Sequence, residues 1–528
     1  MLDEYAAISG LKVNKEKTKA IWIGNFKNRK DKLTVNVNLD WVFEDYFRYL
    51  GIDFSTNLIE MTKYNYMNKI SEIKNQINTW SRRSLTAFGR ITVIKSLLVS
   101  KLNYLFLSLP DPAENQMTEI NRMFYNFVWK GKPDKVSRKQ LIMPYSEGGA
   151  KMINIYLHAK SLKISWIRRL LNGSIDNCLK SLLNTFLPVT LPFNPSLGNW
   201  YVNQQALSVK NSFWKDVFKA YYHVLTMYCK TKACQPLWNN EFIKVNNSPV
   251  YYKKWYDKGV RFINDLLDGN GKFLSYNDFQ IKYHIRSNFI QYYGLRESIK
   301  VSLVKNEPLY LVDQPLRPDI VSLICRFKKG CSHIYTALLT ECKYEQKSLI
   351  NWRKTFDIED EKWRKYCLVA FKCSSEIDLK WFQYKLLNRF LYTNDKLYKM
   401  KIIDNVKCSF CQSIPETIVH LFCECKDVVI LWSQLELWIL QKNDFVVKFA
   451  KENILFGYQG LHNSALNCII IKTKQLIYNS RQQNRPPSFS KLKLSLIDYY
   501  KQEKYIAETN GNINKFDKKW FHFKHFVN

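Results

Sequence analysis

Four residues near the C-terminal end of the chain have the types and the spacing of a metal site. They follow the pattern C-x2-C-x8-H-x4-C and are Cys408, Cys411, His420 and Cys425. Three thiolates and one imidazole are ligands that a tetrahedral Zn2+ takes in a closed structural site. Their order and both short spacings favour zinc over a chance grouping within a chain that has 13 cysteines. The sequence therefore predicts one zinc ion.

The segments between these ligands indicate how the chain brings them together. The close pair of cysteines predicts a tight knuckle, and Pro415-Glu416-Thr417 has the composition of a helix start that carries His420 inward. Cys425 follows His420 by five residues, whereas residues on one face of a straight α-helix are three or four apart. We therefore expect the helix to end or bend before Cys425. Cys423 is a further thiol that competes for the metal in this arrangement.

The context of this motif indicates a structural role for the zinc. The loop between Cys411 and His420 is eight residues long, longer than in a retroviral-type knuckle. An apolar helix is predicted directly after the motif, over residues 428–440. The zinc is therefore expected to hold a C-terminal domain together and not to act in catalysis.

The composition is that of a folded, mainly helical chain. Its 528 residues are enough for about three or four domains, and a hydrophobic content of 46% is ordinary for a globular protein. Glycine (17) and proline (15) are scarce for this length, so long uninterrupted segments are available for helices. The expected fold class is mainly α with a small β part (α+β).

Neither a membrane span nor a secretory signal is expected. The N-terminus begins acidic and polar, unlike a signal peptide. The scattered cysteines are typical of reduced thiols in an intracellular compartment, the nucleus or the cytoplasm. The most apolar stretch, Ile91 to Leu109, is interrupted by Lys95 and Lys101 and is not expected to span a bilayer.

The formal net charge of +34 is the second informative feature. Between Met61 and Leu170 the chain has 19 Lys and Arg against 6 Asp and Glu, with aromatic residues interleaved. Such a pattern is typical of a surface that follows a nucleic-acid backbone. The alternative is a lysine-rich composition that only reflects solvated helix faces and an A/T-rich coding sequence. The expected partners are RNA, DNA or an RNA–DNA hybrid, with no small-molecule substrate.

Apolar periodicity predicts three helices between about residues 60 and 130. One apolar stripe runs from Tyr66 to Trp80, and a second runs from Ile91 to Leu105 and is stopped by Pro110. The third helix covers about residues 114–130. Short connections favour an antiparallel bundle. The region 173–250 has weak periodicity and predicts only a helical linker.

The N-terminal part has a different pattern. Residues 2–9 predict a short helix that ends at Gly10. Strands are expected over 18–24, 33–39 and 46–54, with Gly51 marking a turn or a close approach.

Taken in order, these segments resemble the reverse transcriptase of non-LTR (LINE-type) retrotransposons, just after its catalytic strand-turn-strand. The stretches that carry the resemblance are SGLKVNKEKTKAIWIG (9–24), FRYLGIDFS (47–55), WSRRSLTAFGRITVIKSLLVSKLNYLF (80–106), FYNFVWKGK (124–132) and EGGAKMINI (147–155). The later stretches WYDKGVRFINDLLDGNGKFLSYNDF (255–279) and KLLNRFLYTNDKLYKM (385–400), with the Cys/His segment, resemble the C-terminal region of such proteins. That region includes their reverse-transcriptase zinc-binding domain. The resemblance covers essentially the whole chain.

The resemblance implies roles for two N-terminal features. Lys17 matches the position of a lysine near the incoming nucleotide, and an exposed turn lysine is the alternative. Tyr49-Leu50-Gly51 resembles the primer grip, in which a hairpin backbone holds the primer end against the palm. An ordinary buried strand pair is the alternative there.

The helices from 60 to 130 match the thumb, which lies along the template–primer duplex. In that setting Arg82, Arg83 and Arg90 are expected to contact phosphates, because these bases flank the loop between two apolar stripes. A solvated helix face is the alternative for each of them.

The resemblance also divides the chain into five parts. They are a palm remnant with the primer-grip hairpin (1–58), a helical thumb (59–172), a helical C-terminal or linker region (173–400), a CCHC zinc-binding domain (401–460) and a basic C-terminal tail (461–528).

The catalytic carboxylates of the family have no counterpart in this sequence. Nucleotidyl transfer needs carboxylates that hold two Mg2+ ions about 3.5–4 Å apart, and the family supplies them as one upstream Asp and a Tyr/Phe-x-Asp-Asp turn. This chain contains no Asp-Asp dipeptide. We expect a truncated copy with no catalytic residues, no Mg2+ unless the catalytic palm is present, and no DNA polymerisation by the chain alone. The alternative is a host protein derived from a retroelement that acts as a non-enzymatic nucleic-acid-binding adaptor.

A nuclease function has weaker support. Pro318-Asp319 and Glu341-Cys342-Lys343 resemble the Pro-Asp…Glu-x-Lys signature of the endonuclease in some relatives. Here these residues precede the Cys/His segment, whereas the family's nuclease follows it.

Overall fold

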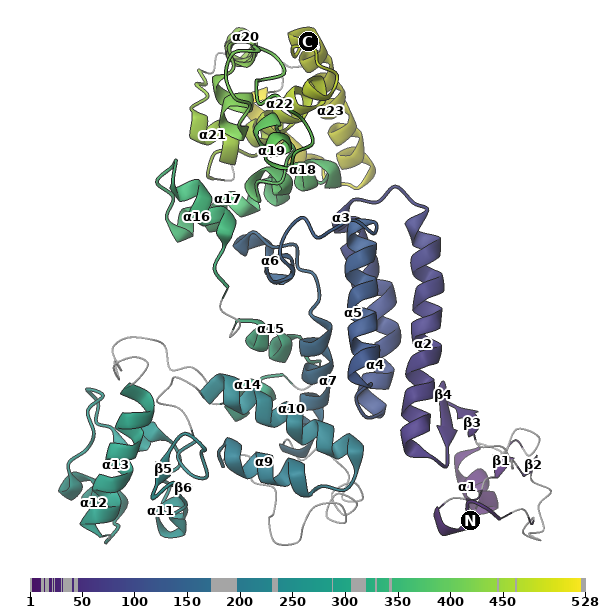
Figure 1. Cartoon of the computed structure of the whole chain (residues 1–528), viewed down its shortest axis with the longest axis vertical. Coiled ribbons are helices and arrows are strands. Elements are labelled where there is room, and N and C mark those ends of the chain that lie inside the picture. Colours follow the sequence, from purple (N-terminus) through teal and green to yellow (C-terminus); the bar gives the residue numbers. More distant parts are fainter. Residues whose placement is uncertain are drawn as a thin grey trace. The chain divides into compact units, whose positions relative to one another are not determined.

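The structure is a computed structural model of the whole chain (Figure 1). It describes residues 2–10, 14, 19–20, 22, 24–29, 31, 40–41, 46–171, 197–229, 236–286, 288–304, 320–327, 330–340, 344–443, 446–460 and 463–523.

The chain divides into two compact units, and each is built from several segments. Unit 1 comprises Met1–Thr79, Leu97–Met123 and Ile155–Cys342. Unit 2 comprises Trp80–Ser96, Phe124–Asn154 and Lys343–Asn528. The residues predicted to form the thumb, 59–172, are therefore divided between the two units.

The N-terminal part of unit 1 contains most of the small β structure. α1 (Leu2–Ser9) ends at Gly10, whose φ of +69° lies in the left-handed region that favours glycine. β1 (Lys19–Ala20) pairs in parallel with β2 (Asp40–Trp41), and η2 (Gly24–Phe26) is a 3-10 turn. The strand expected over 18–24 is thus described only at β1, and the one expected over 33–39 lies outside the described residues.

The third expected strand is a hairpin. β3 (Tyr46–Tyr49) pairs with β4 (Ile52–Ser55) in antiparallel register, with Tyr49 opposite Ile52. Leu50 and Gly51 form the turn, with φ of +48° and +81°. Positive φ at both central residues is the geometry of a tight hairpin turn that matches the strand twist. Gly51 therefore marks a turn, as predicted.

The three helices predicted between residues 60 and 130 are present. α2 (Leu58–Ser81) buries Tyr66, Ile70 and Ile73 of the first stripe. The second runs as α3 (Ala87–Val93), the π-helical turn η3 (Ile94–Leu98) and α4 (Val99–Ser108). α5 (Glu114–Trp129) is the third.

Within unit 1, α2 contacts α4 at two levels. Tyr66 of α2 lies 5.9 Å from Phe106 of α4 between ring centroids, and Glu72 of α2 pairs with Lys101 of α4 at 3.3 Å. A later residue on α2 therefore meets an earlier residue on α4, so these two helices are antiparallel, as predicted.

The remainder of unit 1 is a helical core rich in aromatic residues, among which Trp214, Trp238 and Trp255 are buried. Its elements are α7 (Ile155–Leu171), α9 (Asn199–Ser208), α10 (Ser212–Cys229), β5 (Lys244–Val245), β6 (Ser248–Pro249), α11 (Lys253–Asp257), η5 (Ile263–Leu266), α12 (Tyr276–Tyr283), α13 (Phe289–Val304), α14 (Ile320–Cys325) and α15 (Ser332–Thr340). The described part of the predicted linker, 173–250, contributes α9, α10 and Trp238 to this core.

Unit 2 has a separate hydrophobic core. Its elements, besides α3, are α6 (Arg138–Ile142), η4 (Tyr145–Glu147), α16 (Lys347–Arg353), α17 (Asp360–Cys373), α18 (Ile377–Leu387), α19 (Asn394–Lys399), η6 (His420–Glu424), α20 (Lys426–Asn443), α21 (Lys451–Phe456), α22 (Ser464–Gln482), α23 (Phe489–Thr509) and α24 (Ile513–Trp520). α22 is buried along most of its length, because consecutive residues Ile469, Ile470 and Ile471 all face neighbouring helices.

The segment expected as a basic tail, 461–528, has a different structure where it is described. It forms α22, α23 and α24, and Leu492, Leu496 and Trp520 lie in the core of unit 2. In α23 the buried residues Leu492, Leu496 and Tyr499 recur at helical spacing and are separated by lysines and other polar residues, so the segment has a basic composition although it contains an apolar stripe.

The fold class agrees with the prediction. Among the described residues the β structure amounts to three two-stranded sheets, and the rest of the regular structure is helical. One helical run, Ala87–Ser108, has the length and apolar composition to cross a membrane, and 44% of its most apolar window is buried inside the protein. A single run of this kind is weak evidence for a membrane span, because core helices of globular proteins pass the same test.

Candidate metal centre

The knuckle that carries the first two ligands is a short hairpin. Lys407 and Pro415 form an antiparallel bridge, and the Cys408 N–H donates to the Ile414 carbonyl at 2.8 Å. Gln412 has a φ of +56°, and its N–H donates to the Cys408 carbonyl at 3.0 Å. These bonds turn the backbone tightly, so the thiols of Cys408 and Cys411 come close to each other, as predicted.

The third and fourth ligands lie on either side of a π-helical turn. The Thr417 hydroxyl accepts a hydrogen bond from the His420 N–H at 3.0 Å, which caps the start of the helix that the sequence predicts there. The turn η6 then begins at His420, and the Cys425 N–H donates to the His420 carbonyl at 2.9 Å. This bond spans five residues instead of four. The extra residue accommodates the five-residue step from His420 to Cys425, because it brings Cys425 back beside His420 and ends the helix there.

The four side chains converge on one point. Their ligand atoms all lie within 4.8 Å of one another. The Sγ atoms of Cys408 and Cys425 are 3.8 Å apart, and Cys411 Sγ lies 3.4 Å from His420 Nε2. Zinc–sulfur bonds of about 2.3 Å and zinc–nitrogen bonds of about 2.0–2.1 Å give tetrahedral edges of about 3.8 Å between sulfurs and about 3.6 Å between sulfur and nitrogen. The donor set therefore fits a structural Zn2+ in both chemistry and size.

The electrostatics of the cluster also favour a cation. Burial raises the pKa of the Cys408 thiol to about 12 and raises that of Cys425 as well. Burial acts in the same direction at Cys411, but the backbone N–H groups of Ser413 and Ile414 and the His420 side chain outweigh it and lower the pKa to about 6. A bound Zn2+ supplies the positive charge that stabilises all three thiolates.

Cys423 does not join the ligand group. Its thiol is buried and directed to the Lys451 carbonyl, with 3.8 Å from Sγ to oxygen. Burial raises its pKa to about 12. The π-helical turn places Cys423 on the side of the core, so the competition that the sequence suggests is absent.

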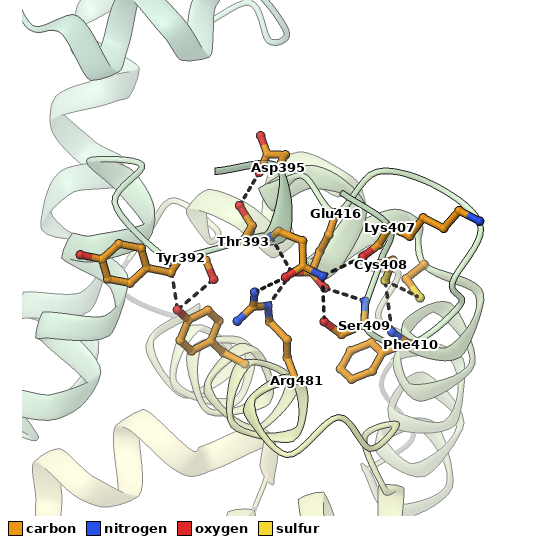
Figure 2. A network of polar contacts seen from close by, with 12 residues as sticks. Tyr392, Thr393, Asp395, Lys407, Cys408, Ser409, Phe410, Glu416 and Arg481 are labelled. Carbon is orange, nitrogen blue, oxygen red and sulfur yellow. Dashed lines mark hydrogen bonds and ion pairs between the residues drawn. The ribbon is translucent and has the colours of Figure 1, made fainter. Parts of the chain in front are cut away.

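A buried ion pair holds the knuckle against the core of unit 2 (Figure 2). Glu416 is fully buried, and its Oε1 lies 2.5 Å from Arg481 Nε on α22. The same carboxylate accepts hydrogen bonds from the N–H groups of Asn394 (3.0 Å) and Ser409 (2.8 Å). Glu416 thus joins the knuckle, the start of α19 and α22. The sequence places Glu416 only at a helix start, since its partner Arg481 is 65 positions away.

The nucleic-acid contacts predicted near the N-terminus are Lys17 and the segment 49–51. Lys17 lies outside the described residues. Tyr49, Leu50 and Gly51 form the tip of the β3–β4 hairpin, where Tyr49 is 59% and Leu50 is 71% exposed. The hairpin tip is therefore accessible, and its role at a primer end stays a prediction.

The three predicted arginines differ in exposure. Arg82 and Arg83 are exposed on the connection between α2 and α3, and the Arg83 guanidinium lies 4.7 Å from the centroid of the Trp80 ring. Arg90 is only 2% exposed. Its guanidinium donates to the carbonyls of Phe127 (2.9 Å), Leu85 (3.4 Å) and Arg83 (3.5 Å). Arg90 therefore holds the backbone of the loop that presents the other two.

An aromatic cluster joins this loop to the zinc-bearing segment within unit 2. Phe88 of α3 lies 5.1 Å from both Trp381 and Tyr384 of α18 between ring centroids. Tyr145 stacks on Phe371 at 4.0 Å. Periodicity within one helix gives no sign of such contacts, because they join residues more than 200 positions apart. The arginine loop and the metal centre thus belong to one compact unit.

The nuclease-like pattern is not tested by the structure. Pro318-Asp319 and Glu341-Cys342-Lys343 lie outside the described residues.

The comparison with known families agrees with the metal centre. A family described as zinc-binding in reverse transcriptase matches residues 344–432, a range that contains all four ligands. The match begins earlier than residue 401, where the sequence places the start of this domain. It includes α16, α17 and α18, and Phe382 of α18 packs against Phe422 of η6 at 6.2 Å between ring centroids. The chain is therefore a reverse-transcriptase-related protein that carries a zinc-binding region.

Proposed function

We propose that this chain derives from the reverse transcriptase of a non-LTR (LINE-type) retrotransposon and binds RNA or an RNA–DNA hybrid inside the cell without polymerising DNA by itself. The observation that carries the proposal is the complete Cys3His ligand set inside the residues that match the reverse-transcriptase zinc-binding family. The LINE-type origin rests on the ordered stretches from 9–24 to 385–400. The net charge of +34 supports a polyanionic partner.

The exposed arginines give this function a first point of contact. Arg82 and Arg83 present planar guanidinium groups that match phosphate geometry. Arg90 positions them, since it fixes the carbonyls of Leu85 and Arg83 from inside the unit. Zinc supplies a structural cross-link when bound, and the chain's own basic side chains bind the nucleic acid.

The hairpin tip gives a second point of contact. Tyr49 and Leu50 are exposed beside Gly51, and apart from its chain neighbours no described atom lies within 4 Å of where a Gly51 side chain would begin, which allows a close approach of the backbone to a primer end. Lys17 remains the proposed contact near an incoming nucleotide.

Equilibrium binding tests this function. The full chain with zinc is titrated into a fluorescein-labelled RNA–DNA hybrid, and anisotropy is followed from low to high salt. We expect the affinity to fall steeply with salt, because neutralised phosphates release counterions. A flat salt response rejects the proposal.

A pair of double variants tests the assigned contacts. R82Q/R83Q should weaken binding by about 10- to 30-fold at 0.15 M salt if each arginine neutralises one phosphate. The matched control is K491Q/K501Q, which removes the same charge from two exposed lysines of α23. Equal losses in both variants reject Arg82 and Arg83 as specific contacts.

Primer extension tests the absence of polymerase activity. The chain is incubated with the hybrid, deoxynucleotides and Mg2+, and extension products are resolved by length. No extension is expected, because two-metal catalysis needs paired carboxylates that this sequence does not contain as an Asp-Asp motif. Extension by the chain alone rejects this part of the proposal.

A further inference from the structure

Four basic residues of unit 2, Lys135, Arg389, Lys396 and Lys399, lie close enough to act electrostatically on one another. Lys135 Nζ lies 5.6 Å from the centroid of the Tyr392 ring. Lys396 Nζ donates to the carbonyl of Arg389, and Lys396 also experiences the charges of Arg389, Lys135 and Lys399. These residues come from two distant segments, the loop before α6 and the stretch from the end of α18 through α19. No charge run in the sequence reveals this cluster.

The positive charges in this cluster exceed the negative charge beside them. Asp395 pairs with Lys399 at 3.5 Å and acts electrostatically on Lys396 and Arg389. Among the described residues, no carboxylate lies within ion-pair distance of Lys135. The pKa of Lys396 is lowered, first by burial and then by its three cationic neighbours, with Asp395 acting in the opposite direction. Four cations beside one carboxylate leave a site that favours an anion.

The four residues are not equally free to bind. Arg389 stacks on the buried Trp352 ring at 4.4 Å, and Lys396 is bonded to the Arg389 backbone, so both are partly engaged in holding the chain. Lys399 is 76% exposed at its side chain, and Lys135 is half-buried against Tyr392. Lys399 pairs with Asp395 only at the surface, so Lys135 and Lys399 have the amines most accessible to a ligand, and the other two add to the local potential.

The metal centre fixes the position of this cluster. α19, which carries Lys396 and Lys399, begins at Asn394. The backbone N–H of Asn394 donates to Glu416, its side-chain amide donates to the Lys407 carbonyl at 2.7 Å, and its Oδ1 accepts from Arg481 at 2.7 Å. The start of α19 is thus tied directly to the knuckle that holds the metal ligands.

We propose that Lys135, Arg389, Lys396 and Lys399 form a site that binds phosphates of a nucleic-acid backbone next to the metal centre. The inference rests on the proposed nucleic-acid-binding function and gives it a second location within unit 2. Lysine amines bind phosphates as point charges and do not read bases, so the site binds without sequence preference. Basic side chains beside an aromatic ring, as Lys135 lies beside Tyr392, are a combination found where proteins bind single-stranded nucleic acid.

Binding by the full zinc-loaded chain tests the site. K135Q/K399Q is compared with K491Q/K501Q on the labelled RNA–DNA hybrid, so both variants lose two charges. We expect K135Q/K399Q to weaken binding by about 10- to 30-fold at 0.15 M salt and to reduce the slope of log affinity against log salt by about 1–2, because two phosphate contacts are lost. The control should change affinity by less than about twofold, since general charge loss acts weakly at this salt.

The outcomes separate this inference from the function on which it rests. If K135Q/K399Q binds as tightly as the wild type, or if both double variants lose affinity equally, the site is rejected while salt-dependent binding by the wild type keeps the proposed function. If the wild type itself shows no salt-dependent binding, both are rejected. If the chain is retained on a poly-glutamate column and the variants do not differ in affinity for the hybrid, the result indicates an acidic protein partner. That outcome also rejects the site.

Two further measurements distinguish a loss of binding from a loss of folding. Each variant is checked for one zinc per chain and for an unchanged unfolding midpoint. The single variant K399Q repeats the test at the most exposed of the four side chains and should lose about half of the effect on the salt slope. An unchanged salt slope in K399Q rejects its contact with phosphate.

Discussion

Unit 2 contains two buried clusters of cysteines, and they are satisfied in different ways. At the metal centre, the ligand atoms of Cys408, Cys411, His420 and Cys425 all lie within 4.8 Å of one another. In that centre the Nδ1 atom of His420 is buried and has no hydrogen-bond partner among the described residues. Backbone N–H groups stabilise the thiolate of Cys411, whereas burial disfavours the thiolates of Cys408 and Cys425. Such a donor set is stabilised by a bound cation.

The second cluster surrounds Cys373 and Cys468 and is satisfied by the protein itself. The Cys468 thiol donates to the Cys373 carbonyl at 2.8 Å and contacts the Tyr499 hydroxyl at 3.5 Å. That hydroxyl contacts Ser374 at 2.9 Å and donates to Glu503 at 3.0 Å. The side-chain hydrogen bond between Cys373 and Cys468, together with burial, raises the pKa of Cys373 well above its usual value. Proximity of thiols therefore does not define a metal site; the number of donors aimed at one point does.

Removal of metal ligands should have the largest effect and separates the two clusters most clearly. C408S/C411S should lose the zinc, about one equivalent per chain, and should lower the unfolding midpoint, because structural zinc sites contribute about 10–16 kcal/mol of binding free energy to folding. Metal content by mass spectrometry and thermal unfolding measure both effects. C373S/C468S is the matched control and should retain the zinc. Zinc loss in the control would mean that the second cluster contributes to the metal site.

After a chelator removes the metal, the reactivity of the thiols also distinguishes the metal centre from the cluster around Cys373 and Cys468. After chelation at neutral pH, Cys411 should react first with a thiol reagent, because its pKa of about 6 leaves it mostly as thiolate. Cys408, with a pKa of about 12, should react slowly. The Cys411 rate should be flat above about pH 7 and fall as the pH drops through about 6, since protonation removes the nucleophile.

The second cluster provides the control for this measurement. Cys373 and Cys468 are buried, so they should stay unreactive until the chain unfolds. Mass mapping of the labelled sites identifies each thiol. Labelling of Cys373 before Cys411 contradicts the assignment.

Loss of the ion pair between Glu416 and Arg481 should have the next largest effect. E416Q removes the charge that Arg481 faces at 2.5 Å in a buried setting, and loss of one partner of a buried pair costs about 3–5 kcal/mol. Unfolding in urea measures this cost, and zinc affinity should fall with it because the knuckle loosens. E424Q is the matched control, since its pair with Lys451 is exposed and should be worth about 0–1 kcal/mol. Equal effects in the two variants contradict a structural role for Glu416.

The sequence predicts the metal ligands and the first helices well, because both depend on local spacing. The pattern of Cys408 to Cys425 and the stripe from Tyr66 to Ile73 are each readable within about 20 residues. The bend before Cys425 is also predictable, since a five-residue step does not fit an α-helical face.

What the sequence does not predict depends on contacts between distant segments. Glu416 finds Arg481, and Phe88 finds Trp381, only after the chain has folded. Arg90 resembles Arg82 in the sequence, yet burial separates their roles. The basic cluster of Lys135, Arg389, Lys396 and Lys399 is hidden for the same reason, because Lys135 is more than 250 residues from its partners.

The smallest effect is expected in the cluster around Cys373 and Cys468, whose polar groups are satisfied by the protein itself. Y499F removes one hydroxyl that contacts Ser374, Cys468 and Glu503, and loss of a buried hydrogen-bonded group costs about 1–3 kcal/mol. Urea unfolding should show this decrease while the zinc content stays at one per chain, because no metal ligand contacts Tyr499 among the described residues. Glu503 remains paired with Lys519 at 2.6 Å and with the Trp520 indole at 2.8 Å, which limits the loss. A loss of zinc in Y499F would show that the two clusters are coupled through the core, and their independence would have to be abandoned.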